Sequence, residues 1–185
     1  MRRWIIALPL GFSALFGNPL SAQAATAAPG PDPTWLEWNA TTRTAKFKLV
    51  AGIPGRAKSP FNFNGYTDGE LTLVVPLGST VVMNFVNDDG TPHSAQIINS
   101  GGTMPNMAID VAAIPRAYSK QAGEGIGQFG TDILRFTAAP AGDYLIFCGV
   151  PGHGLSGMWI RFAVSPTAQA PALIETPKSA RGAGR

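Results

Sequence analysis

The feature that most constrains the fold is a succession of short β-type segments separated by turn-forming residues. Residues 45–50 alternate apolar and charged side chains, as a half-buried strand does. Residues 71–75 and 79–86 are rich in β-branched side chains, and the turn signal Pro76-Leu77-Gly78 separates them. Further segments bounded by Gly, Pro or Asn follow at 93–98, 132–136, 143–148 and 158–164. About seven short strands of this kind predict an all-β sandwich of two sheets.

Two stretches do not fit a strand. Residues 35–42 are expected to form a short helix or an irregular lead-in. Residues 99–130 contain six glycines, two prolines and no sustained periodicity. Because this stretch is long for a sandwich connection, we expect an ordered loop, with room for a helical turn, packed over one end of the sheets.

The first 24 residues have the three parts of a secretory signal peptide. Two arginines precede an apolar run at 4–16, and Ala22-Gln23-Ala24 offers a small-x-small cleavage site. The apolar run is short for a bilayer span and contains Pro9 and Gly11. We therefore expect an exported protein, periplasmic or otherwise outside the cytoplasm. Retention of the segment as an anchor stays open, and membrane association is expected only in that case.

Composition divides residues 25–185 into three parts. Residues 25–34 are small and Pro-containing and are expected to be a flexible linker, residues 35–164 form the predicted domain, and the Ala/Pro-rich residues 165–185 are expected to be a disordered tail. The sequence pI of 9.3 reflects the ends, because residues 35–164 carry nine basic and nine acidic side chains. Without a clustered Lys/Arg face, nucleic acid is excluded as a partner.

Cys148 is the only cysteine, so it cannot form an internal disulfide. It is either an inert buried side chain or a thiolate held by a metal. His153 and Met158 follow it with the spacing C-x4-H-x4-M, in a loop whose glycines and proline allow the chain to fold back on itself. All three side chains can then converge at one end of the sandwich.

The only other histidine is His93, which opens a strand after the polar turn at 87–90. Two imidazoles, a thiolate and a weak thioether form the ligand set that suits copper cycling between Cu(I) and Cu(II). A structural zinc site would rarely use a thioether as its fourth ligand, and a catalytic one would hold water there. His93 is assigned to this set because the chain has no other histidine to offer, since no local spacing links it to Cys148.

These residues carry a resemblance to a known family. The stretches Phe61–Tyr66, Val75–Gly78, Pro92–Ser94, Cys148–Gly154 and Gly157–Trp159 resemble the cupredoxin superfamily, and within it the sulfocyanin family, with rusticyanin a more distant relative. The resemblance spans residues 35–164. It implies a Greek-key β-sandwich and a blue-copper electron carrier that feeds a respiratory chain. An apolar patch beside His153 would suit a weakly bound redox partner, such as a c-type cytochrome or a terminal oxidase.

The resemblance also implies one type 1 copper ion with the ligands His93, Cys148, His153 and Met158. By the same analogy we expect the Ser94 backbone N–H to donate to the Cys148 sulfur. Phe63, Phe85 and Phe147 are either walls of the site or ordinary core, and Phe147 points away from Cys148 on its strand. The electron is expected to leave through the edge of His153, beside Val150, Pro151 and Leu155.

Alternative functions can be compared with the electron carrier by the residues that each of them requires. A multicopper oxidase requires more than the two histidines present, and a binuclear copper domain requires a second cysteine. We therefore expect an electron carrier and not an enzyme. A copper chaperone or storage protein is the alternative, although it would need exposed thiols or clustered methionines. A secreted binding domain without metal is the third possibility.

Overall fold

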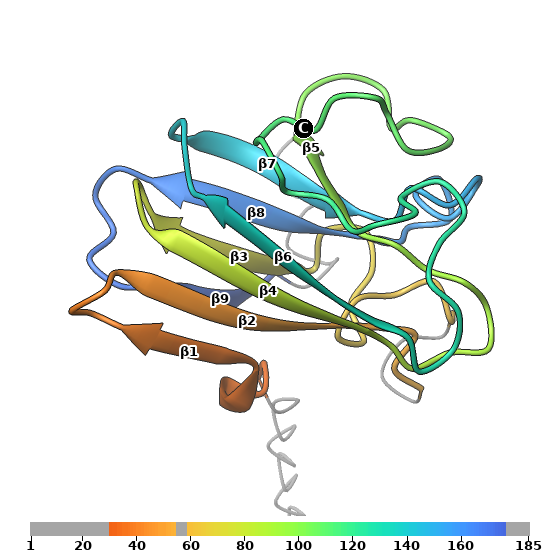
Figure 1. Cartoon of the computed structure of the whole chain (residues 1–185), viewed down its shortest axis with the longest axis horizontal. Helices are drawn as coiled ribbons and strands as arrows, with labels where there is room; N and C mark the ends of the chain where they lie inside the picture. The colour runs from red at the N-terminus through yellow and green to blue at the C-terminus, as the bar shows by residue number, and fades with distance from the viewer. Residues whose placement is uncertain (1–29, 55–58, 177–185) are drawn as a thin grey trace, which may run out of the picture.

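Two β-sheets face each other in the structure, a computed structural model that describes residues 30–54 and 59–176 (Figure 1). The first sheet has the strand order β1-β2-β4-β6 and the second β5-β7-β8-β3-β9. The predicted all-β sandwich is confirmed. The strands are β1 (Leu36–Asn39), β2 (Thr44–Ala51), β3 (Leu71–Pro76), β4 (Thr80–Asn87), β5 (Gln96–Asn99), β6 (Thr131–Thr137), β7 (Gly142–Phe147), β8 (Trp159–Ser165) and β9 (Ala172–Glu175).

Alternation of apolar and polar side chains sets which face of each strand is buried. In β2, Phe47 and Leu49 are buried while Lys46 and Lys48 are exposed. Successive side chains of a strand point to opposite faces, so the apolar set of each sheet meets that of the other. Phe136 of the first sheet and Phe162 of the second pack edge to face, with ring centroids 5.9 Å apart. The core therefore lies between the sheets.

Strand pairing brings two distant parts of the chain to one end of the sandwich. β5 and β7 are antiparallel neighbours, with Gln96 opposite Phe147. The residues that precede β5 and those that follow β7 consequently lie side by side. This end also holds the blue loop between β7 and β8 and part of the green long loop, at the right of Figure 1.

Two expectations about the ends of the domain differ from the structure. Residues 35–42 are not a helix or an irregular lead-in: a single 3-10 turn, η1 (Pro33–Trp35), leads directly into β1. The predicted disorder of the tail is wrong for residues 172–175, because they form β9, paired antiparallel with β3. Leu173 packs against the core, and this adds a short strand to the otherwise open edge of β3. The predicted signal peptide and residues 177–185 lie outside the described residues.

The long connection between β5 and β6 is an ordered loop, as predicted. Residues 100–130 contain no helix, but one bond from Gly125 N–H to Gln121 O (2.7 Å) closes a single α-type turn. Backbone bonds tie it to the second sheet: Ile97 N–H donates to Ala117 O (2.9 Å), and Ser119 N–H donates to Ala95 O (2.8 Å). A further bond, from Ala108 N–H to Gly149 O (2.7 Å), joins it to the loop after β7. Across the described residues, no helix has the length and apolar character needed to cross a membrane.

Candidate metal centre

Three predicted ligands converge at the end of the sandwich where β7 ends and β5 begins. The donor atoms of His93, Cys148 and His153 all lie within 4.8 Å of one another. The two Nδ1 atoms are 3.2 Å apart, and the Cys148 Sγ lies 4.0 Å from the Nδ1 of His93 and 3.4 Å from that of His153. A metal about 2.0–2.3 Å from each donor would separate the donors by roughly 3.3–4 Å. The cluster therefore has the dimensions and the soft, mixed donor chemistry of a three-coordinate metal site.

The loop after β7 carries Cys148 and His153. Cys148 N–H donates to Met158 O (3.0 Å), and Met158 N–H donates to His153 O (3.1 Å), so the loop closes on itself as predicted. A side chain at position 149 would clash with Ala108 and with the carbonyl of Ala122, which explains the glycine there. The backbone of the loop thus fixes the separation of the two donors.

His93 is fixed by a different segment. Its N–H donates to Ile126 O (3.1 Å), and Ile126 N–H donates back to His93 O (2.7 Å), which forms a bridge to the long loop. His93 therefore lies beside the cysteine loop, as expected. The long loop, whose role the sequence did not reveal, holds this histidine in place.

Met158 is fully buried directly before β8, and its backbone bonds to both Cys148 and His153. Its role as the fourth, weak ligand stays a prediction. Of the proposed wall residues, Phe63 and Phe85 belong to the main core together with Cys148, whereas Phe147 packs on the opposite face of the sheet with Ile98 and Leu145.

Phe61 is a wall residue that the sequence did not identify as one. Its ring lies 4.5 Å from the ring of His153 and 6.3 Å from the ring of His93, measured between centroids. Phe61 is half-buried, so it covers the outer side of both imidazoles. The only signal in the sequence was its place at the start of the stretch Phe61–Tyr66.

Burial controls the protonation of all three donors. It raises the pKa of the Cys148 thiol, and hydrogen bonds from the Ser94 and Val150 backbone N–H groups oppose this effect. Burial also lowers the pKa of His93, against the influence of Asp89, and lowers the pKa of His153 to about 4. Neutral imidazoles at ordinary pH can each offer an Nδ1 lone pair to a metal, whose binding would also displace the thiol proton.

The depressed pKa of His153 predicts that the metal-free protein loses stability in acid. In the unfolded chain the pKa of His153 lies near the ordinary histidine value of 6.5, and in the folded chain burial lowers this pKa to about 4. Between these values the unfolded state binds more protons, so the free energy of unfolding should fall by about 3 kcal/mol as the pH decreases from 6.5 to 4. Urea denaturation of the metal-free protein at several pH values measures this loss.

The control is His153→Gln, which does not titrate and should remove most of the slope in this window. An equal slope in native and variant proteins would contradict the assignment.

Ser94 connects three segments around the cysteine. Its backbone N–H donates to the Cys148 Sγ (3.4 Å), which is the bond expected from the family resemblance. Its hydroxyl accepts from Gly149 N–H (3.0 Å) and donates to Ala122 O (2.6 Å). The side chain therefore joins the cysteine loop to the long loop.

Ser94→Ala should cost about 1–3 kcal/mol of unfolding free energy, because it leaves the buried Gly149 N–H without its partner. Chemical denaturation of the metal-free variant measures the cost. Ser156→Ala is the matched control, since the Ser156 hydroxyl bonds to Gly152 O at an exposed position, and it should change stability by less than about 0.5 kcal/mol. Equal losses in the two variants would contradict the bridging role of Ser94.

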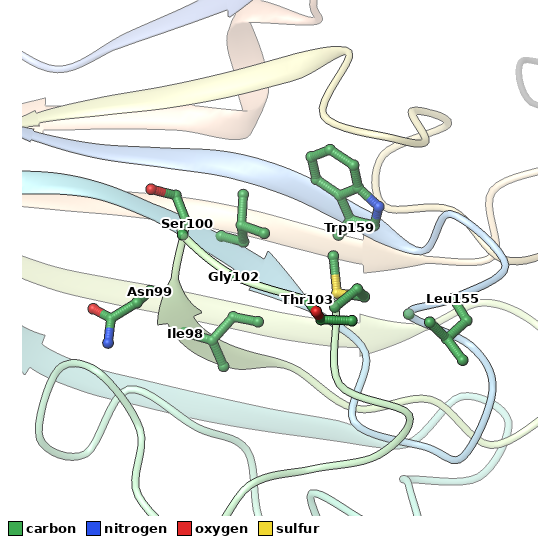
Figure 2. A pocket seen from close by; sticks show the side chains of 11 residues that line it. Ile98, Asn99, Ser100, Gly102, Thr103, Leu155 and Trp159 are labelled. Carbon is green, nitrogen blue, oxygen red and sulfur yellow. The ribbon is translucent and has the colours of Figure 1, made fainter.

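A cavity of about 300 Å³ lies on the outer face of the second sheet, beside the cysteine loop (Figure 2). Ile98, Asn99, Leu145 and Trp159 line it from the strands, and Ser100–Met104, Gly154 and Leu155 line it from the loops. None of the three clustered donors is among its lining residues. The metal centre and this cavity are therefore separate features.

Comparison with known proteins places these features in a family. A family model described as "Sulfocyanin (SoxE) domain" matches residues 31–175, which is most of the chain. The chain belongs to the sulfocyanin family. The predicted resemblance is thus confirmed, and the match extends through β9, beyond the expected end of the domain at residue 164.

Relatives of this sulfocyanin-family chain agree with that assignment. It is 30% identical to sulfocyanin of Sulfolobus acidocaldarius over 119 residues, which are 60% of this chain and 59% of that protein. It therefore spans about three fifths of the length of that curated relative. It is also 33% identical to rusticyanin of Acidithiobacillus ferrooxidans over 128 residues, 66% of this chain and 77% of that protein.

Solved structures resemble the fold as well. A methionine-to-glutamine variant of rusticyanin superposes with a TM-score of 0.53 at 27% identity, covering 66% of this chain and 78% of that one. The predicted cupredoxin-like sandwich is confirmed. In this sulfocyanin-family chain, the clustered imidazoles and thiolate fit one type 1 copper ion, which their softness and trigonal arrangement favour over other metals.

Proposed function

We propose that this chain is a mononuclear blue-copper electron carrier, which passes single electrons between redox proteins outside the cytoplasm. The observation that supports this most directly is the buried convergence of the only cysteine and both histidines on one point. With both histidines in one cluster, the chain has none left for a second copper of an oxidase type. The single ion would supply one-electron chemistry, without a substrate to convert.

The protein's own contribution would be a frame that changes little between the two oxidation states. His93 is tied to Ile126 by two backbone bonds, and Cys148 and His153 are tied to Met158 by one each. Donors held by backbone hydrogen bonds in a packed core move little when their metal gains or loses an electron. Met158 would be the weak axial ligand, and together with the N–H bonds to Cys148 Sγ it would tune the reduction potential.

Electrons would pass through His153. This imidazole is 8% exposed, whereas His93 and Cys148 are fully buried. The same loop carries half-buried Val150 and the exposed side chains of Pro151 and Leu155. A small apolar patch suits a weakly bound, fast-dissociating partner, and we propose a c-type cytochrome or a terminal oxidase. The balanced charge of residues 35–164 predicts little electrostatic steering.

The location follows from the amino-terminal segment. Its signal-peptide pattern supports export to the periplasm or another extracytoplasmic space. Membrane association would arise only if this segment were retained.

A copper chaperone or storage protein is the second candidate, and the site favours it less. Such a protein must exchange its metal with a partner, which requires accessible thiol ligands. Cys148 is fully buried here. Access to the metal through His153 alone favours movement of electrons over movement of copper.

Titration of the purified protein with Cu(II), followed by absorption spectroscopy, tests the proposal. We expect one equivalent to produce an intense thiolate-to-copper band at the red end of the visible spectrum, bleached reversibly by a one-electron reductant. A colourless protein that binds only Cu(I) would support the chaperone instead. Failure to take up either ion would contradict both functions.

A further inference from the structure

The outer nitrogen of His93 has a carboxylate partner. His93 directs Nδ1 toward the other two donors, while its Nε2 lies 3.1 Å from Asp89 Oδ2. The His93 side chain is fully buried, and that of Asp89 is 23% exposed. The imidazole therefore lies between the metal cluster on one side and a carboxylate near the surface on the other.

The turn after β4 builds this arrangement. Asp89 N–H donates to Asn87 Oδ1 (2.9 Å), and Gly90 N–H donates to Asp89 Oδ1 (2.7 Å), which leaves Oδ2 to face His93. A side chain at position 52 would overlap the Cβ of Asp89, so the glycine there lets the turn pack against the end of β2. The carboxylate is held in position by the backbone, independently of His93.

The same turn is joined to the segment that holds the His93 backbone. The buried Asn87 side chain donates to both Thr91 O and Ile126 O, each at 2.8 Å. Ile126 in turn forms the two backbone bonds with His93. The backbone of His93 and the partner of its ring are consequently parts of one hydrogen-bonded unit.

We propose that Asp89 is a positioning residue for the copper ligand His93 and lowers the reduction potential of the site. This inference rests on the proposed function. The carboxylate accepts the Nε2–H of His93, which fixes the tautomer whose Nδ1 is free to bind the metal. The negative charge also makes the imidazole a stronger donor, which stabilises Cu(II) more than Cu(I).

Asp89 and the hydrogen bonds to the Cys148 thiolate have opposite effects on the reduction potential. The Ser94 and Val150 N–H groups draw electron density from the Cys148 sulfur and favour Cu(I). Asp89 supplies density through His93 and favours Cu(II). The potential of this site would then be a balance between the groups that bond to the Cys148 sulfur and the carboxylate that bonds to His93.

A redox titration of the copper-loaded protein, monitored by its visible band, tests the proposal with Asp89→Asn. The amide keeps a similar shape and can still accept the Nε2–H bond, but it removes the charge. We expect the ratio of Cu(I) to Cu(II) at fixed ambient potential to rise about tenfold, a shift of about +59 mV for one electron. The band itself should remain, because the three donors are unchanged.

Asp88→Asn is the matched control, since it removes the same charge from the exposed neighbouring residue. Its shift should be much smaller, because water screens that carboxylate. Equal shifts in the two variants, or no shift in Asp89→Asn, would overturn the proposal. Asp89→Glu, which keeps the charge on a longer side chain, should recover part of the native potential.

A second measurement requires no copper. Nitrogen-edited NMR of the metal-free native protein should place the ring proton of His93 on Nε2, with solvent exchange at least tenfold slower than in Asp89→Ala. A proton on Nδ1, or equal exchange rates, would overturn the positioning role. If the native protein bound no copper, the proposed function would fail while this measurement still decided whether Asp89 fixes the His93 tautomer.

Discussion

Replacing Cys148 with serine should abolish the visible band of the copper-loaded protein and weaken Cu(II) binding by more than about 100-fold. The band requires charge transfer from a thiolate sulfur, and a serine hydroxyl stays protonated and is a poor ligand for copper. Loss of a group that only supports a ligand costs 10–100-fold in metal affinity, so loss of the ligand itself should cost more. Absorption spectra and a competition titration against a chelator measure the two effects.

Ser156→Ala is the control for this variant, because Ser156 lies in the same loop with its hydroxyl exposed. It should keep both the band and the affinity. A Cys148→Ser protein that stayed blue would contradict the assignment of the thiolate. Circular dichroism of the metal-free variant should match that of the native protein, since the two side chains are nearly the same size.

Phe162→Ala should lower the free energy of unfolding by about 3–5 kcal/mol. Phe162 is fully buried on β8 and packs against Phe136 of the opposite sheet and Tyr144 of the adjacent strand, at centroid distances of 5.9 Å and 6.2 Å. Its removal leaves a cavity where the two sheets meet, and a core this densely packed collapses only partly around the loss. Denaturant unfolding of the metal-free protein measures the effect without a contribution from metal binding.

Ile133→Ala on β6 is the comparison, since Ile133 is 62% exposed. Its cost should stay below about 0.5 kcal/mol. A loss below about 1.5 kcal/mol for Phe162→Ala would contradict the view that this ring couples the two sheets.

The cysteine loop and the sandwich were predictable because their determinants are local. Alternation with a period of two identifies strands such as β2, and the spacing between Cys148 and His153 lies within one short loop. His93 is distant in sequence, and it could be assigned only because the chain has no third histidine. Its pairing with the cysteine depends on the β5–β7 register, which no local pattern specifies.

Features that depend on tertiary contacts were missed. The four residues of β9 lie in an Ala/Pro-rich stretch and become a strand only because the edge of β3 accepts them. Asp89 looks like an ordinary turn residue, and its role depends on the side chain of His93 facing it. The long loop was expected to be ordered, but its two backbone bonds to His93 through Ile126 depend on tertiary contacts and were not predicted.

The short strand β9 has a consequence for behaviour at high concentration. Without it, the six residues of β3 would present unpaired N–H and C=O groups along an apolar edge, a template for pairing with another molecule. β9 occupies that edge and, being only four residues long, offers little new edge of its own. The carboxyl-terminal segment thus protects the sandwich against self-association through the edge of β3.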